Sequence, residues 1–93
     1  MTQLKLNQRR SNIQIIADML RSGETGAGKT KIMYTNNMSY TQIQKYLSFL
    51  LTRGFITEVH VGNPKVTYQV TDTGLKLLKS IEGITEMLGW LDE

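Results

Sequence analysis

Residues 23–30 form the one stretch of the chain that matches a catalytic motif. They read Gly-Glu-Thr-Gly-Ala-Gly-Lys-Thr, which fits the phosphate-binding loop G-x-x-x-x-G-K-S/T letter for letter. That loop binds nucleotides because it leaves a β-strand, wraps backbone N–H groups around the phosphates and enters a helix whose N-terminus faces them. The motif taken alone predicts a nucleotide-dependent ATPase.

The residues before this motif predict a helix rather than a strand. Ile13, Ile16, Ala17 and Leu20 are spaced i, i+3, i+4 and i+7, which is one face of a helix, and Gly23 follows where such a helix ends. A chain of 93 residues also lacks room for a parallel sheet with its crossover helices. We therefore interpret the motif as a glycine-rich loop between two helices, with a P-loop nucleotide-binding protein as a remote alternative.

No other residues combine into a catalytic or metal-binding site. The chain has no cysteine and one histidine, His60, so it can form neither a disulfide framework nor a thiolate or multi-histidine metal site. No carboxylates pair in an apolar setting, and no serine or threonine has the spacing of a nucleophilic triad. We expect no enzymatic activity, no metal, no cofactor and no small-molecule substrate.

Positive charge is concentrated in the first half of the sequence. Residues 1–53 hold eight Lys and Arg against two acids, whereas residues 54–93 hold three against six. A basic half on a small domain is typical of proteins that bind a polyanion. No apolar run approaches the length of a membrane span, and the chain does not begin with a secretory signal. We expect a cytoplasmic, nucleoid-associated protein without a membrane partner.

Three helices are predicted in the basic half. The first is capped by Ser11 or a neighbour, and the second spans residues 29–35 until Asn36-Asn37 breaks it. The third spans residues 40–53, because a capping box starts it and Arg53 followed by glycine ends it. The capping box consists of Ser39 and Gln42, and the apolar stripe behind it consists of Ile43, Leu47, Leu50 and Leu51.

The period of the pattern changes after the third helix. Residues 55–61 and 66–70 are rich in β-branched and aromatic residues and flank a polar tip that holds the single proline, so they predict a β-hairpin. Thr71 or Asp72 then caps a final helix. We predict an α+β winged helix-turn-helix, with three helices and a hairpin wing, followed by a long C-terminal helix.

The final helix carries a heptad seam. Its apolar residues fall at spacings of 4, 3, 4 and 3, which is typical of a coiled coil. Gly83 and Gly89 lie inside this predicted helix, where each costs about 1 kcal/mol relative to alanine. We expect residues 1–72 to form a DNA-binding domain with a short N-terminal arm, and residues 73–93 to form a dimerisation helix. The predicted dimer interface consists of Leu77, Ile81, Ile84, Leu88, Trp90 and Leu91.

Two stretches of the chain carry a family signature. They are Lys29-Thr30-x-Ile32-Met33-Tyr34 and Asn37-x-Ser39-Tyr40-x-Gln42-x-x-Lys45-Tyr46-Leu47, continued by Leu50, Gly54, Ile56, Tyr68, Thr71, Gly74, Leu77 and Leu78. From Ser11 onward the chain resembles the small archaeal winged-helix DNA-binding proteins. The resemblance implies a chromatin protein that binds double-stranded DNA as a homodimer, joined by an antiparallel coiled coil of the last helices. It also assigns Lys29 and Thr30 to the start of a helix rather than to a phosphate site.

The third helix supplies the predicted DNA-reading face. An α-helix fits the major groove of B-DNA, and this one has a polar face without acids. Gln44 can pair with adenine edges, and Lys45 can reach guanine or phosphate. Thr41 and Ser48 are expected to contact phosphate or sugar, and Tyr40 to donate its hydroxyl to a phosphate.

Further DNA contacts are expected outside that helix. Two arginines begin the first helix, where the helix dipole disfavours cations, which indicates a nearby phosphate. Two lysines begin the second helix, which crosses the DNA backbone in helix-turn-helix proteins. Two further contacts, Asn63 and Lys65, are expected at the wing tip. These predicted contacts are Arg9, Arg10, Lys29, Lys31, Asn63 and Lys65.

The preferred hypothesis is a homodimer that binds double-stranded DNA with low or modest sequence specificity. Its role would be chromatin organisation, with an overlap into transcriptional regulation. One alternative is a sequence-specific transcriptional repressor, which the base-reading capacity of Gln44 permits. Another is a winged helix that contacts only proteins.

Overall fold

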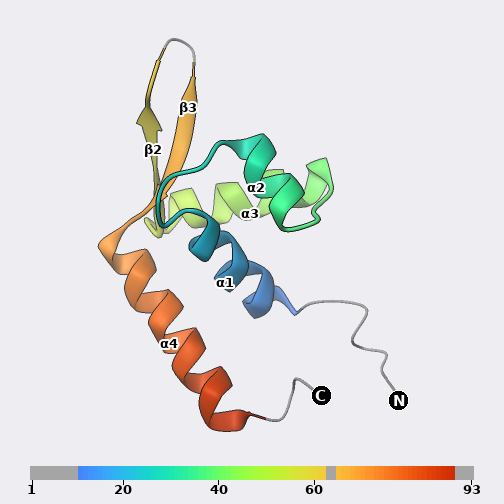
Figure 1. Ribbon diagram of the computed structural model, residues 1–93, viewed down its shortest axis with the longest axis vertical. Helices are drawn as coiled ribbons and strands as arrows, with labels where there is room; N and C mark the ends of the chain where they lie inside the picture. The colour runs from blue at the N-terminus through green and yellow to red at the C-terminus, as the bar shows by residue number, and fades with distance from the viewer. Residues whose placement is uncertain (1–10, 63–64, 90–93) are drawn as a thin grey trace.

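A computed structural model describes residues 11–62 and 65–89 (Figure 1). Three helices precede an antiparallel hairpin and a fourth, longer helix, so the predicted α+β winged helix-turn-helix is confirmed. The elements are α1 (Asn12–Ser22), α2 (Lys29–Thr35), α3 (Tyr40–Thr52), β2 (Ile56–His60), β3 (Val66–Val70) and α4 (Asp72–Leu88).

Side-chain caps set the beginnings of three helices, as the sequence predicted. Ser11 and Gln14 form a capping box at the start of α1, and Ser39 and Gln42 form another at the start of α3. The Thr71 hydroxyl accepts from the N–H of Gly74 and caps α4. Each cap satisfies backbone N–H groups that have no partner inside the helix.

The turn between α2 and α3 contains a left-handed residue. Asn37 has φ 55°, a conformation that asparagine tolerates better than most residues. Asn36 is buried just before it, and its amide donates to the Ser22 hydroxyl and to the Ile32 carbonyl. The predicted break at this asparagine pair is therefore confirmed, and it orients α3 relative to α2.

The glycine-rich loop joins α1 to α2, as predicted, but it also lies along the hairpin. Ala27 and Tyr68 exchange backbone hydrogen bonds of 3.1 and 2.8 Å, and the Val70 N–H donates to the Gly23 carbonyl at 2.9 Å. The loop therefore lies beside β3 and forms an isolated β-bridge with it. This pairing was not predicted, because glycine and threonine residues at these positions indicate an irregular connection.

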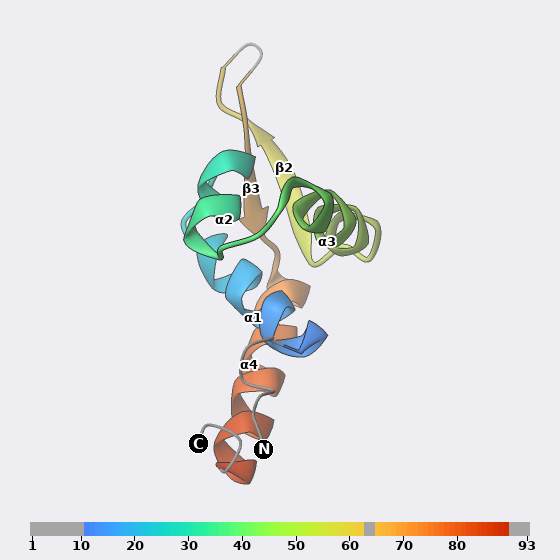
Figure 2. The ribbon, with the colours of Figure 1, turned by 90° about the vertical axis from the view of Figure 1, so that its right-hand side faces the viewer.

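The wing and the end of α4 project from opposite ends of the molecule (Figures 1 and 2). β2 and β3 pair antiparallel, in a register that runs from Ile56 opposite Val70 to His60 opposite Val66. Ile56 and Val70 are buried at the base, whereas the rest of β2 is exposed. The base of the hairpin is thus anchored in the core and the wing extends from it.

The core joins all four helices. Its fully buried side chains come from α1, α2 and α3, and Leu78 adds the first half of α4 with 2 % of its surface exposed. Leu77 and Ile81 are partly buried against this core. The residues buried most completely are Leu20, Ile32, Ile43 and Leu50. The division of the chain at residue 72 remains a prediction.

The predicted apolar face of α1 was wrong in part. Ile13 is 58 % exposed, whereas Ile15, which was not on the predicted face, is 6 % exposed. α1 packs against both α2 and α4, so its buried surface is wider than a single stripe. Periodicity cannot show this, because it identifies one face and not the number of neighbours.

The interior position predicted for Gly89 was also wrong. Gly89 has φ 56° and is the left-handed residue that ends α4 after Leu88. Glycine adopts this conformation without a Cβ penalty and commonly ends helices. The predicted interface residues Trp90 and Leu91, and the predicted DNA contacts Arg9, Arg10 and Asn63, lie outside the described residues.

Candidate nucleic-acid interface

α3 separates its residues cleanly between the core and the solvent. Ile43, Tyr46, Leu47 and Leu50 are buried on one side. The Tyr46 hydroxyl donates to Asn12 Oδ1 of α1 at 2.5 Å, which fixes α3 against the first helix. The residues predicted for the DNA face are all exposed: Tyr40, Thr41, Gln44, Lys45 and Ser48.

The structure brings Lys29 of α2 to two of those α3 residues. Its ammonium donates to Gln44 Oε1 and lies 4.7 Å from the centre of the Tyr40 ring. A cation over an aromatic face is attracted by the ring quadrupole. Lys29, Tyr40 and Gln44 are therefore one cluster that joins the two helices of the helix-turn-helix.

Two more cations of this region lie over aromatic rings. The Lys45 ammonium is 5.7 Å from the ring centre of Tyr46, and the Arg53 guanidinium is 5.0 Å from that of Phe49. Phe49 is partly exposed and was not predicted as a surface residue. The sequence offers one signal for it, since position 49 falls outside the apolar stripe of α3.

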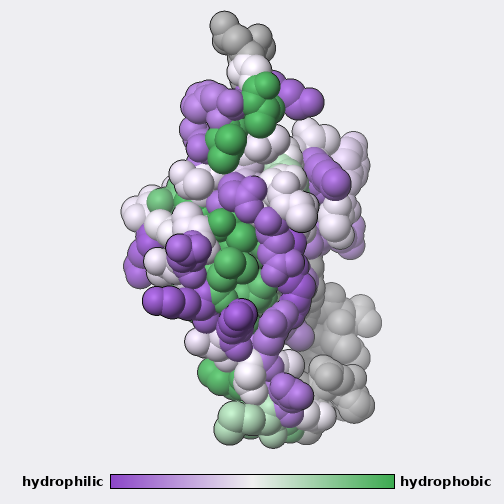
Figure 3. Space-filling model, turned by 60° about the vertical axis from the view of Figure 1, so that its left-hand side comes forward, coloured by the Kyte–Doolittle hydropathy of each residue, from purple (hydrophilic) through white to green (hydrophobic). Residues whose placement is uncertain are grey.

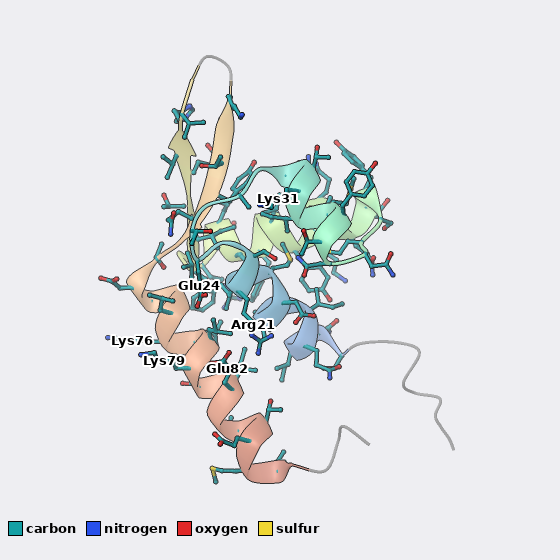
Figure 4. All side chains as sticks on the ribbon, viewed as in Figure 1. Arg21, Glu24, Lys31, Lys76, Lys79 and Glu82 are labelled. Atoms are coloured by element: carbon teal, nitrogen blue, oxygen red, sulfur yellow. The ribbon has the colours of Figure 1, made fainter. Side chains whose placement is uncertain are left out.

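The remaining predicted contacts lie apart from this cluster. Lys31 is exposed on α2 (Figure 4). Lys65 is exposed at the end of the wing, where its carbonyl accepts from the Val61 N–H at 3.1 Å. α2 and α3 lie next to each other, and the wing extends past them (Figure 2). The predicted residues thus occupy two areas, the helix pair and the wing.

Charge is distributed unevenly over the molecule. No Asp or Glu occurs in residues 29–53, so the helix pair carries cations alone. Acidic groups instead meet a cation between α1 and α4, where Arg21 pairs with Asp18 and Glu82 at 3.0 Å each (Figure 4). These pairs are partly solvated, and such pairs contribute about 0–1 kcal/mol each. Asp18 of α1 and Glu82 of α4 therefore lie beside Arg21 and not on the α2–α3 face.

Tyr68, on strand β3 of the wing, carries no charge at physiological pH. Burial raises the pKa of the Tyr68 phenol, and the Glu58 carboxylate across the sheet raises that pKa further. Since the pKa of an ordinary tyrosine is already about 10, the phenol stays neutral at physiological pH.

The phosphate-loop match lacks the geometry of a phosphate site. A helix precedes it, and several of its backbone N–H groups donate within the protein: Glu24 to Arg21, Gly26 to Gly23 and Ala27 to Tyr68. The lysine of the motif, Lys29, contacts Gln44 instead of reaching over the loop. The sequence-based interpretation as an inter-helix loop is confirmed.

Residues 11–62 and 65–89 offer neither a membrane-spanning helix nor a cluster of metal ligands. No helix there has the length and apolar character that a membrane span requires. No three His, Asp or Glu side chains within those ranges gather closely enough to hold a metal ion.

The end of α4 carries exposed apolar side chains. Met87 is 84 % exposed, Ile84 58 % and Leu88 48 %. Figure 3 shows this apolar surface at the bottom of the view, at the far end of α4. We call Ile84, Met87 and Leu88 the α4 patch. Met87 was not part of the predicted seam.

Comparisons with known proteins agree with this fold. A sequence profile of the winged helix-turn-helix family matches residues 9–89, and the chain therefore belongs to that family. A protein of Methanocaldococcus jannaschii with no assigned function is 31% identical over 81 residues, which are 86% of this chain and 78% of that protein. The predicted resemblance to small archaeal winged-helix proteins is confirmed.

Solved structures show the same arrangement. Sso10a-2, a DNA-binding protein from Sulfolobus solfataricus, matches with a TM-score of 0.78 and 29% identity over 88% of this chain and 85% of that one. A variant of S. aureus MepR matches with a TM-score of 0.71 and 18% identity, over 91% of this chain and 66% of that one. Another MepR variant, bound to an oligodeoxyribonucleotide, matches with a TM-score of 0.70 and 14% identity. At these identities MepR supports the fold alone.

Proposed function

We propose that this protein binds double-stranded DNA through α2, α3 and the wing, with low or modest sequence preference. One observation carries the proposal: the face formed by α2 and α3 presents exposed polar and cationic side chains and has no acid from residue 29 to 53. The likeness to Sso10a-2, which is a DNA-binding protein, supports it. The proposed activity is binding, without catalysis.

In this proposal α3 enters the major groove and α2 crosses the backbone. Helix-turn-helix proteins dock in this way, and an α-helix fits the groove. Lys31 and Lys45 contact phosphates, which position the protein without reading sequence. Thr41 and Ser48 add phosphate or sugar contacts, and Lys65 on the wing reaches the backbone beside the groove.

We further propose that two copies pair through their α4 helices in antiparallel orientation. The exposed α4 patch supports pairing, because apolar side chains at helical spacing are typical of a helix–helix seam. Lys76 and Lys79 lie near the start of α4, and Asp92 and Glu93 follow α4 in the sequence, so antiparallel pairing centred near Ile84 would bring opposite charges toward each other. The same register sets Glu82 opposite Glu86 of the partner subunit, which is a smaller unfavourable contribution. Such a dimer offers two DNA faces, which suits a role in chromatin organisation with an overlap into transcriptional control.

Affinity for several unrelated duplexes across a salt series tests the proposal. Non-specific binding predicts dissociation constants of about 10⁻⁴ to 10⁻⁶ M at physiological salt. For each neutralised phosphate, the logarithm of the affinity should fall by about 0.9 when the salt concentration rises tenfold. Similar values on all duplexes support the proposed role. Tight binding to one palindromic site with weak binding elsewhere would identify a sequence-specific repressor. The absence of salt-dependent affinity for DNA would indicate a winged helix that contacts only proteins.

A further inference from the structure

The cluster of Lys29, Tyr40 and Gln44 changes what Gln44 can recognise. Lys29 is the first residue of α2, yet its ammonium reaches across to α3 and donates to Gln44 Oε1. The ring of Tyr40, one helical turn before Gln44, lies 4.7 Å from the same ammonium. The lysine is thus held between two residues of the proposed DNA-reading face.

The chemistry of lysine fixes the orientation of the glutamine amide. The orientation of a side-chain amide is often ambiguous, because its oxygen and nitrogen atoms are hard to distinguish. An ammonium has three donors and no acceptor, so only the amide oxygen can face it. The NH₂ group is therefore the part of Gln44 left without a partner in the cluster, and it can only donate.

A glutamine beside a cation is a poor partner for adenine. The usual glutamine–adenine pair needs the amide oxygen to accept from the N6 amino group while the NH₂ group donates to N7. One lone pair of Gln44 Oε1 is already used by Lys29. The ammonium beside that oxygen also opposes the approach of a second donor, because the hydrogens of the adenine N6 amino group carry partial positive charge.

Guanine fits the same cluster. Its major-groove edge presents two acceptors, O6 and N7. The NH₂ group of Gln44 can donate to one of them and a free N–H of Lys29 to the other. Together the two side chains present a pair of donors, which is the pattern by which a single arginine reads guanine.

We propose that Lys29 is a specificity-determining residue, which converts Gln44 from an adenine reader into half of a two-donor unit that prefers guanine. The inference rests on the proposed DNA-binding function and deepens it. It also replaces the adenine contact that the residue type of Gln44 suggests by itself. Tyr40 acts as a positioning residue that holds the ammonium against the amide.

The test is selection from a pool of duplexes with a randomised central segment, at a fixed salt concentration. Wild-type protein should enrich guanine at the position that α3 contacts. Lys29→Met removes the cation, frees Gln44 Oε1, and should move the preference at that position toward adenine by roughly five-fold or more, the range of one good bidentate contact. Lys29→Arg keeps a cation without acceptors and should keep guanine.

Lys31→Met is the matched control. It removes the same charge from the same helix, and Lys31 is not part of the cluster. It should weaken binding to all duplexes without moving the base preference. The double variant Lys29→Met with Gln44→Ala should lose the adenine preference that the single variant gains, because the change acts through Gln44. Identical preferences for Lys29→Met and Lys31→Met, or adenine enrichment by the wild-type protein, would overturn the inference.

A second measurement separates this inference from the proposed function. The side-chain amide protons of Gln44 should shift in the NMR spectrum of Lys29→Met without DNA, and should stay in place in Lys31→Met. DNA binding with no base preference in any variant would reject the role of Lys29 and leave the proposed function standing. Absence of DNA binding by wild-type protein, with the amide contact present, would reject the function itself.

Discussion

Cations paired with aromatic rings are the recurring residue-level feature of the proposed interface. Long side chains lose rotamer freedom when they bind a phosphate, and a ring that already holds the cation reduces that loss. Each pair contributes about 0.5–1 kcal/mol at an exposed site. The pairs are Lys29 over Tyr40, Lys45 over Tyr46 and Arg53 over Phe49.

Lys45→Ala should weaken binding to every duplex to a similar degree. The residue is exposed on the α3 face, which has no acidic side chain. Each lost phosphate contact makes the fall of log affinity with log salt concentration less steep by about 0.9. Fluorescence anisotropy across a salt series measures both quantities. Lys79→Ala is the control, since Lys79 projects from the outer side of α4, away from α2 and α3 (Figure 4). Equal effects of the two variants would contradict the assignment of α3 as the DNA face.

The start of α4 contacts the segment that joins α3 to the hairpin. The Thr71 hydroxyl donates to the Gly54 carbonyl at 2.6 Å, and the Thr71 N–H donates to the Phe55 carbonyl at 3.0 Å. Gly74 lies directly beneath, where an added Cβ would be 2.0 Å from the Phe55 oxygen. The wing and the end of α3 are therefore fixed to α4 by close backbone contact.

Gly74→Ala should lower the free energy of unfolding by about 1–3 kcal/mol or more, because backbone atoms must move to admit the methyl group. Gly83→Ala lies in the same helix, with no atom within 4 Å of its added Cβ. That change should raise the free energy of unfolding by up to about 1 kcal/mol. Urea denaturation measures both. Similar effects from the two variants would show that α4 does not pack beneath Phe55 in solution.

Local signals in the sequence predicted the elements and their starts. The capping box of Ser39 and Gln42, the apolar stripe of α3 and the change of period after Gly54 are each contained in a short stretch of chain, so they can be recognised without tertiary structure. Contacts between distant segments could not be predicted in this way. The pairing of Ala27 with Tyr68 joins residues far apart in the sequence, as does the contact of Lys29 with Gln44.

The sequence predicted which side chains of α3 face solvent, but not which neighbours they contact. The exposed face of α3 follows from its apolar stripe, because the remaining positions must face solvent. The partners of those side chains depend on how α2 crosses α3. Gly89 shows the same limit, since glycine inside a helix and glycine that ends one look alike in a sequence.

The proposed DNA face and the α4 patch lie far apart in the molecule. The wing and the α2–α3 pair lie toward one end, and α4 extends to the other (Figures 1 and 2). A partner on the α4 patch would therefore leave the DNA face free. Two copies joined there would present two such faces.

Antiparallel pairing can be tested with cysteines, because the chain has none. Pairing centred near Ile84 brings the two copies of that residue together, so Ile84→Cys should form cross-linked dimers under oxidising conditions. Leu77→Cys should not link to itself, because its two copies lie on opposite sides of the centre. Ready linking of both single variants would indicate a parallel pair. A monomer at micromolar concentration by sedimentation would reject pairing through α4.

An NMR titration of the ¹⁵N-labelled protein with a DNA duplex tests directly whether the α2–α3 face binds DNA. The largest backbone amide shifts should fall in residues 29–53 and at Lys65, and they should decrease as salt is added. Amides of residues 84–88 should move little. Shifts confined to α4, or no shifts at duplex concentrations well above about 10⁻⁴ M in low salt, would contradict the claim that the α2–α3 face binds DNA.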